Sequence, residues 1–180
     1  QINLLVWGGS LGARVFSEVV PQALAALPEE LRKRLKVTQQ IKADDLNRVR
    51  AVYANAGIEV EAAPFFTDVP TCLRDAHLVI GRAGGSSVAE LTMSGRPSIL
   101  VPLPIAASDE QGANGQALVD AGAAWMIRQP DFTPAALTSL LTDLFSHPEK
   151  LENAAKAAHS CARPHAAAKV ADLIESALRP

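Results

Sequence analysis

Short apolar runs alternate with helix-like segments along most of the chain, and this alternation restricts the folds that the sequence can adopt. Each run has the composition of a buried strand, and the segments between the runs place apolar residues three or four positions apart. The expected strands are Ile2 to Trp7, Leu35 to Gln39, Glu59 to Ala63, Leu78 to Ile80, Ser98 to Val101 and Ala123 to Ile127. This order predicts an α/β fold, a Rossmann-like doubly wound parallel sheet with helices on both faces.

The C-terminal quarter shows only helical patterns. From Thr133 onward, the segments "TPAALTSLLTDLF", "HPEKLENAAKAAHS" and "RPHAAAKVADLIESAL" follow one another without a strand-like run. We expect these final helices, about 133–180, to pack on the sheet, so that residues 1–180 form a single domain. A length of 180 residues with 48% hydrophobic residues is enough for one well-buried core.

The composition argues against several classes of function. A net charge of −2, from 17 basic and 19 acidic residues, offers no basic surface for a nucleic acid. Cys72 and Cys161 form no C-x-x-C motif, which is typical of a protein from a reducing compartment. The histidines do not cluster with carboxylates at metal-ligand spacing, so we expect no metal, and we expect no other cofactor either. No apolar run approaches the ~20 residues of a membrane span. These features are typical of a cytoplasmic protein with at most peripheral membrane contact.

The first residues indicate that the chain is part of a longer protein. The sequence begins "QINLLVWGGS", with no initiator methionine and with an expected strand almost at once. We therefore expect a preceding domain, which would hold part of any active site, to lie outside this chain.

A glycine-rich loop follows the first expected strand, in the stretch "VWGGSLGAR". Glycines let a ligand approach the backbone, and the N–H groups at the start of the next helix can receive a phosphate. The loop lacks both the G-x-G-x-x-G spacing and the lysine of a P-loop. A tight turn without a ligand explains it equally well.

A second glycine-rich loop, in "GRAGGSSVAELTMSG", joins the fourth expected strand to a helix. A helix that begins at this junction would direct several N–H groups and its positive end at a diphosphate. Glu90 has two interpretations. It either closes a capping box with Ser87 or accepts hydrogen bonds from the hydroxyls of a ribose.

The third loop lies in "VPLPIAASDEQGANGQAL", where a polar run precedes a helix. Its Asp109, Gln111 and Asn114 lie near the helix start, where an amide could bind sugar hydroxyls. The alternative is N-capping by Ser108 or Asp109, with Gln111 merely solvated. Because all three loops lie at the carboxyl ends of parallel strands, together they predict a nucleotide sugar as the ligand.

Four motifs in this order resemble one family: "GGSLGAR", "PFFTDVP", "RAGGSSVAELTMSGRPSILVPLP" and "DEQGANGQAL". Over essentially the whole chain, the sequence is similar to the C-terminal, donor-binding half of the MurG family of peptidoglycan glycosyltransferases (glycosyltransferase family 28, GT-B fold). The resemblance implies inverting, metal-independent transfer of N-acetylglucosamine from UDP-N-acetylglucosamine to a lipid-linked muramyl-pentapeptide. It also implies that an N-terminal domain, absent from this chain, binds the acceptor and supplies the catalytic base at the inner face of the membrane.

The resemblance also implies which residues bind the donor. It assigns Ser10 to the phosphate region, the backbone of Phe66 to the uracil edge and Glu90 to the ribose. It assigns Gln111 to the hydroxyls of N-acetylglucosamine. The helix start that faces the diphosphate comprises Gly85, Ser86, Ser87, Val88 and Ala89.

The chain departs from the family pattern at a few positions. Leu11 stands where glutamine is common, Ile105 where histidine is usual, and Gly85 and Gly115 replace alanines. These departures leave Glu90 and Gln111 in place and bear on donor affinity. The segment "TQQIKADD" differs from the family's glycine-containing turn, and no role is assigned to it.

Other residues and other functions have competing interpretations. Arg82, beside the second loop, contacts either a phosphate or a neighbouring acid, whereas Trp7 and Trp125 are expected in the core. The alternatives to a donor domain are another UDP-sugar transferase or 2-epimerase of the same fold, or a non-catalytic nucleotide-binding module.

Overall fold

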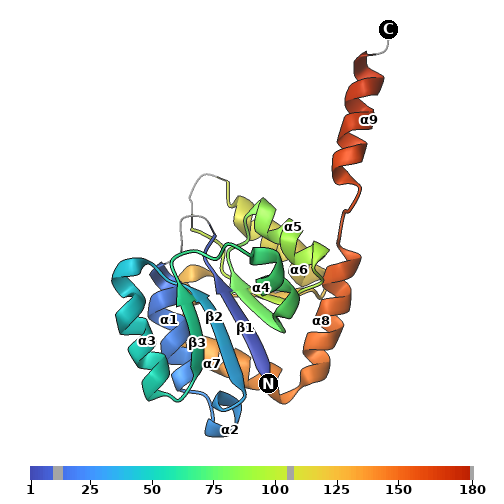
Figure 1. The fold of residues 1–180 in the computed structure, drawn as a ribbon. Helices are drawn as coiled ribbons and strands as arrows, with labels where there is room; N and C mark the ends of the chain where they lie inside the picture. Colours follow the sequence, from blue (N-terminus) through green and yellow to red (C-terminus); the bar gives the residue numbers. More distant parts are fainter. Residues whose placement is uncertain (10–13, 105–107, 179–180) are drawn as a thin grey trace.

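A computed structural model describes residues 1–9, 14–104 and 108–178 and shows a single parallel sheet with helices on both faces (Figure 1). The sheet has six strands in the order β3-β2-β1-β4-β5-β6, and every neighbouring pair is parallel. The strands are β1 (Ile2–Trp7), β2 (Leu35–Gln40), β3 (Glu59–Ala63), β4 (Leu78–Gly81), β5 (Ser98–Leu100) and β6 (Ala124–Met126). The predicted doubly wound fold is confirmed, and each strand lies within one residue of its expected bounds.

Two groups of helices cover the two faces of the sheet. The helices are α1 (Arg14–Ala25), α2 (Glu29–Arg32), α3 (Leu46–Asn55), α4 (Val69–Asp75), α5 (Gly85–Met93), α6 (Glu110–Asp120), α7 (Pro134–Ser146), α8 (Pro148–Ser160) and α9 (Ala166–Leu178), with 3-10 turns at Ala43–Asp45 and Gln129–Asp131. Helices α1, α3 and α7 pack on one face, and α4, α5, α6 and α8 on the other (Figure 1).

The alternation of side chains along β1 separates two hydrophobic cores. Leu4 and Val6 belong to the core under α1, α3 and α7, whereas Leu5 belongs to the core under α4, α5 and α6. Successive residues of a strand point to opposite faces, so an apolar run such as that of β1 is buried on both sides. The loops at the strand ends are thereby held on a rigid base.

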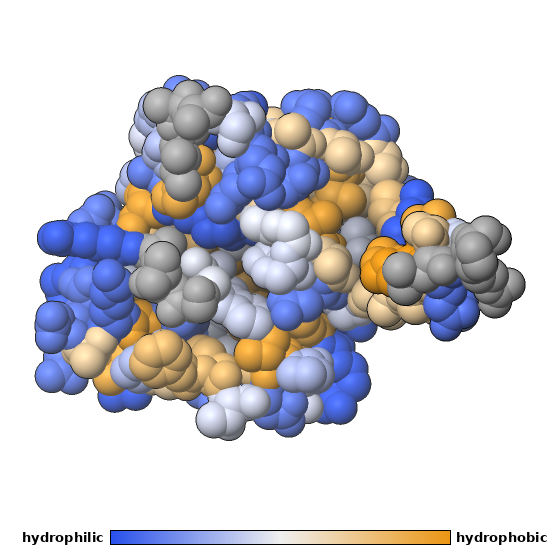
Figure 2. Space-filling model, turned by 90° about the horizontal axis from the view of Figure 1, so that it is seen from above, coloured by the Kyte–Doolittle hydropathy of each residue, from blue (hydrophilic) through white to orange (hydrophobic). Residues whose placement is uncertain are grey.

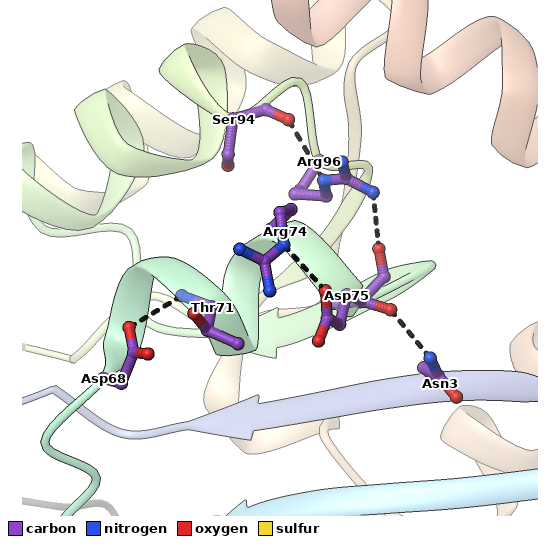
Figure 3. A network of polar contacts seen from close by, with 8 residues as sticks. Asn3, Asp68, Thr71, Arg74, Asp75, Ser94 and Arg96 are labelled. Atoms are coloured by element: carbon purple, nitrogen blue, oxygen red, sulfur yellow. Dashed lines mark hydrogen bonds and ion pairs between the residues drawn. The ribbon is translucent and has the colours of Figure 1, made fainter.

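Helix α4 is fixed at both of its ends by hydrogen bonds (Figure 3). At its start, the carboxylate of Asp68 accepts the N–H of Thr71 at 3.1 Å, as an N-cap does. At its end, the side-chain amide of Asn3 donates to the carbonyl of Asp75 at 2.8 Å, and Arg96 donates to the next carbonyl at 2.7 Å. The C-terminal end of α4 is therefore tied to β1 through Asn3.

The C-terminal helices differ from one another in their packing. Helix α7 buries Leu137, Leu141 and Leu144 in the first core, and α8 packs beside α5. Helix α9, in contrast, projects away from the sheet, and the side chains from 163 to 177 are all exposed (Figure 1). The expectation that all of 133–180 packs on the sheet therefore describes α7 and α8 but not α9, whose alanine-rich sequence offers few large apolar side chains.

We predict that two glycines at opposite ends of α5 respond differently to alanine. Gly95 follows the helix with φ +62°, where a β-carbon costs about 1–2 kcal/mol, and that carbon would lie 3.4 Å from Cβ of His159. Gly85 is the first helical residue, and a β-carbon there would meet no atom within 4 Å. Gly95→Ala should therefore lower the free energy of unfolding by about 1–2 kcal/mol, and the control Gly85→Ala should not lower it. Urea denaturation measures both, and equal losses would contradict the described path of the chain.

Candidate functional site

A cavity of about 270 Å³ lies at the carboxyl ends of the strands, between the loop after β1 and the start of α5. Figure 2 looks onto this end of the molecule, where apolar surface is interspersed with hydrophilic surface. The strand order reverses between β1 and β4, so the helices that follow these strands lie on opposite faces and leave a crevice. The cavity is lined by Leu5, Trp7, Gly9, Gln40, Phe65, Phe66, Val69, Cys72, Ser86, Ser87 and Glu90.

The first turn of α5 presents backbone N–H groups that are not paired within the helix. Its N-cap is Gly84, which makes no side-chain capping hydrogen bond, and the first intrahelical bond is donated by Val88 to the carbonyl of Gly84 at 3.0 Å. The N–H groups of Gly85, Ser86 and Ser87 therefore have no intrahelical acceptor. Because Ser86 and Ser87 line the cavity, the positive end of α5 is available to an anion there.

Glu90 lies one turn further along α5 and is exposed on the wall of the same cavity. The capping-box interpretation is wrong, because Ser87 is the third residue of the helix and Gly84 is the N-cap. Within the described residues, no hydrogen bond or ion pair engages the carboxylate of Glu90, whose backbone carbonyl accepts the hydroxyl of Ser94 at 2.6 Å. The carboxylate is therefore free to accept hydroxyl groups of a ligand.

The loop after β3 contributes two aromatic residues. Phe66 is half-buried, whereas Phe65 is 73% exposed, and both line the cavity. The sequence motif pointed only to Phe66. Phe65 was missed, although an apolar residue directly before a predicted ligand contact is a signal that could have identified it.

Helix α6 supports the segment that leads into α5. The amide nitrogen of Asn114 donates to the carbonyl of Ala83 at 3.0 Å, and the amide oxygen of Gln111 accepts the N–H of Leu103 at 3.0 Å. Gln111 is half-buried beside Gly84, so the interpretation as a merely solvated residue is wrong. It adjoins the N-terminus of α5 but does not line the cavity.

The interpretation that Ser108 or Asp109 caps α6 through its side chain is not supported by the structure. Asp109 occupies the N-cap position in a left-handed conformation, with φ 42°, but it makes no side-chain capping bond. Its carboxylate instead pairs with Arg128 at 2.6 Å. The hydrogen bond from Arg128 holds the pKa of Asp109 below its usual value, so this side chain is an anion near neutral pH.

Arg82 has a role that neither earlier interpretation described. It is half-buried and donates to the carbonyls of Val101 at 3.0 Å and Pro102 at 3.3 Å, while its guanidinium lies 5.2 Å from the ring centre of Phe16. Burial lowers the pKa of Arg82 from its usual value, but an arginine remains protonated at pH 7. Within the described residues it makes no ion pair, and it connects the end of β5 to α1.

The structure brings together four of the predicted donor-binding residues. Phe66, Ser86, Ser87 and Glu90 line the cavity. Gly85, Val88 and Ala89 belong to the same helix without lining it, whereas Ser10, together with Leu11 and Ile105, lies outside the described residues.

Besides Phe65, several cavity residues were not predicted as site residues, among them Trp7, Cys72 and Gln40. Trp7 is half-buried rather than fully in the core, because it stands at the end of β1. Cys72 of α4 also faces the cavity, and burial raises the pKa of its thiol. Gln40, in the segment to which no role was assigned, hydrogen-bonds to two loops, with its amide oxygen on the N–H of Gly8 and its amide nitrogen on the carbonyl of Pro64.

In residues 1–9, 14–104 and 108–178, no group of three or more His, Cys, Asp or Glu side chains is arranged to hold a metal ion. Of the helices within these ranges, none has the length and apolar character to cross a membrane.

Comparisons with a family model, with curated relatives and with solved structures agree on one family for nearly the whole chain. The model of the glycosyltransferase family 28 C-terminal domain matches residues 3–176. The UDP-N-acetylglucosamine–N-acetylmuramyl-(pentapeptide) pyrophosphoryl-undecaprenol N-acetylglucosamine transferase of Gluconobacter oxydans is 90% identical over 99% of the chain, and the protein of the same name from Granulibacter bethesdensis is 56% identical over 98%. These matches cover 49% and 46% of the two relatives, so the chain spans about half of their length.

A solved structure agrees with these relatives. The crystal structure of MurG from Acinetobacter baumannii superposes with a TM-score of 0.88 and 35% sequence identity. The match covers 97% of this chain and 52% of that one.

We predict that Ser87 contributes little to the stability of α5. Since Ser87 is not an N-cap, Ser87→Ala should change the free energy of unfolding by less than about 0.5 kcal/mol. The comparison is Thr133, an N-cap whose hydroxyl accepts the N–H of Ala136 at 3.2 Å, and Thr133→Ala should cost about 1 kcal/mol. Thermal and urea unfolding measure both variants. If Ser87→Ala lowered the free energy of unfolding as much as Thr133→Ala does, the capping-box interpretation of Ser87 and Glu90 would be correct.

Proposed function

Because the chain belongs to the family of glycosyltransferase family 28 C-terminal domains, we propose that it is the donor-binding part of an inverting N-acetylglucosaminyltransferase and binds UDP-N-acetylglucosamine. The relative that is 90% identical bears the name of such a transferase. The observation that best supports the proposal is the cavity in which the start of α5, the carboxylate of Glu90 and the loop at Phe66 meet.

The first turn of α5 is suited to the diphosphate. The N–H groups of Gly85, Ser86 and Ser87 and the positive helix end stabilise negative charge without a cation. This stabilisation grows as the bond from the sugar to UDP breaks, because the charge on the leaving diphosphate increases in the transition state. The helix end thus serves as the electrostatic catalyst for departure of UDP.

The remaining donor contacts are proposed from the family pattern and the positions of the residues. Glu90 accepts the ribose hydroxyls, the backbone of Phe66 binds the uracil edge, and Gln111 binds hydroxyls of N-acetylglucosamine beside the start of α5. Ser10, which follows Gly9 in the sequence, is proposed from the family pattern alone to contact the phosphates.

The acceptor and the catalytic base are proposed to lie in the rest of a longer protein. The relatives are about twice as long as this chain, and their name specifies a lipid-linked muramyl-pentapeptide as the acceptor. We propose that residues 1–180 form the donor domain and that the complete protein adds N-acetylglucosamine to that lipid at the cytoplasmic face of the membrane, in peptidoglycan synthesis. The exposed apolar face of α9, with Val170, Leu173 and Ile174, is suited to pack against that remainder.

We predict that the purified 180-residue chain binds UDP but transfers no sugar. Isothermal titration with UDP, UDP-N-acetylglucosamine, UDP-glucose and NAD measures the binding, and a radiolabelled donor with a lipid-linked acceptor measures transfer. Binding of NAD without binding of UDP would refute the donor site. Transfer by this chain alone would refute the proposal that the acceptor site and the catalytic base lie outside it. Inversion at C2 of the donor sugar without an acceptor would indicate the 2-epimerase alternative.

We predict that Glu90 distinguishes UDP from 2′-deoxy-UDP. If its carboxylate accepts the ribose hydroxyls, UDP should bind more tightly by about 1–3 kcal/mol, the usual contribution of hydrogen bonds to a charged group. Glu90→Ala should remove this preference, and calorimetry of both ligands with both proteins gives the coupling energy of the pair. If both proteins are folded and the coupling energy between the substitution and the missing hydroxyl is near zero, Glu90 does not bind the ribose.

A further inference from the structure

The side chain of Gln40 connects two loops at the rim of the cavity. Its amide oxygen accepts the N–H of Gly8 at 3.3 Å, and its amide nitrogen donates to the carbonyl of Pro64 at 3.2 Å. Gly8 begins the loop after β1, and Pro64 begins the loop that carries Phe65 and Phe66. The side-chain amide of Gln40 thus accepts a hydrogen bond from the loop after β1 and donates one to the loop after β3.

The backbone pairing explains why a side chain is needed at this point. The register of β1 and β2 ends at Val6 and Gln39, whereas β2 and β3 remain paired up to Gln40 and Ala63. Backbone hydrogen bonds therefore no longer hold the C-terminal end of β1 beside that of β2. The side chain of Gln40, the residue after Gln39, continues the connection by accepting the N–H of Gly8.

Gln39 and Gln40 have separate tasks because neighbouring side chains of a strand point to opposite faces. Gln39 is fully buried, where it accepts the hydroxyl of Tyr53 and donates to the carbonyl of Phe16 at 3.3 Å. Gln40 is half-buried and lines the cavity. A substitution at Gln40 therefore alters the cavity rim and leaves the buried polar pair in the core intact.

We propose that Gln40 is a positioning residue that sets the spacing between the loop at Gly8–Gly9 and the loop at Phe65–Phe66. The inference rests on the proposed function, in which the first loop meets the phosphates and the second meets the nucleobase. A fixed spacing favours ligands that engage both loops at once, because neither loop then has to be ordered during binding. Gln40 thereby selects nucleoside diphosphates over nucleosides.

The test compares UDP, which reaches both loops, with uridine, which reaches only the second. Gln40→Met keeps the length of the side chain and removes both hydrogen bonds. Titration calorimetry gives the dissociation constants of uridine and UDP for both proteins. In Gln40→Met the ratio of the uridine constant to the UDP constant should be at least about fivefold lower than in the wild type, which is about 1 kcal/mol of lost coupling. The affinity for uridine itself should change less than about twofold. The control is Gln116→Met, an exposed residue of α6 that lies outside the cavity and should leave the ratio unchanged.

A second variant keeps the inference testable if Gln40→Met does not fold. Gln40→Glu retains the acceptor for Gly8 but cannot donate to the carbonyl of Pro64, so the ratio should fall here too. A ratio within twofold of the wild-type value in folded variants, or equal losses for both ligands, would overturn the positioning role. A wild-type chain that binds no UDP would overturn the proposed donor site itself, which separates the two failures.

Discussion

The hydrogen-bonded position of β1 between β2 and β4 determines where every loop of the site lies. Both ladders are parallel and in fixed register, so the exits of these strands fall at one edge of the sheet. The reversal of strand order at β1 then sends α1 and α5 to opposite faces, which opens the crevice in which the cavity lies. Both faces of β1 are buried, with Leu4 and Val6 in one core and Leu5 in the other, so the strand is anchored from both sides.

The start of α5 combines a local deficit of capping with the proposed binding site. A serine or aspartate at position 84 would offer an oxygen to the first-turn N–H groups, as Thr133 does at the start of α7. Gly84 offers none, so these groups need a partner from outside the helix. Asn114 of α6 donates a hydrogen bond to the carbonyl of Ala83 and so connects the segment just before this uncapped end to α6.

The sheet and most of the helices could be predicted from the sequence, because buried parallel strands are apolar runs and each is followed by a periodic segment. The cavity could be predicted in outline, since the glycine loops fall at strand ends. Three details could not be predicted. The spacing of Ser87 and Glu90 fits a capping box, and only the backbone shows that the helix begins three residues earlier. Gln40 and Arg82 act through backbone groups of loops that are distant in sequence, and no local pattern reports such contacts.

Helix α9 has 13 residues, and its described side chains, 166–177, are all exposed, which has a thermodynamic consequence. An isolated helix of that length is close to the helix–coil midpoint in water, because the cost of nucleation is spread over few hydrogen bonds. The order of residues 166–178 would therefore depend on a surface that covered Val170, Leu173 and Ile174. Part of the free energy of that contact is consumed in fixing the backbone, so the segment would associate by coupled folding and would release readily when the covering surface moves.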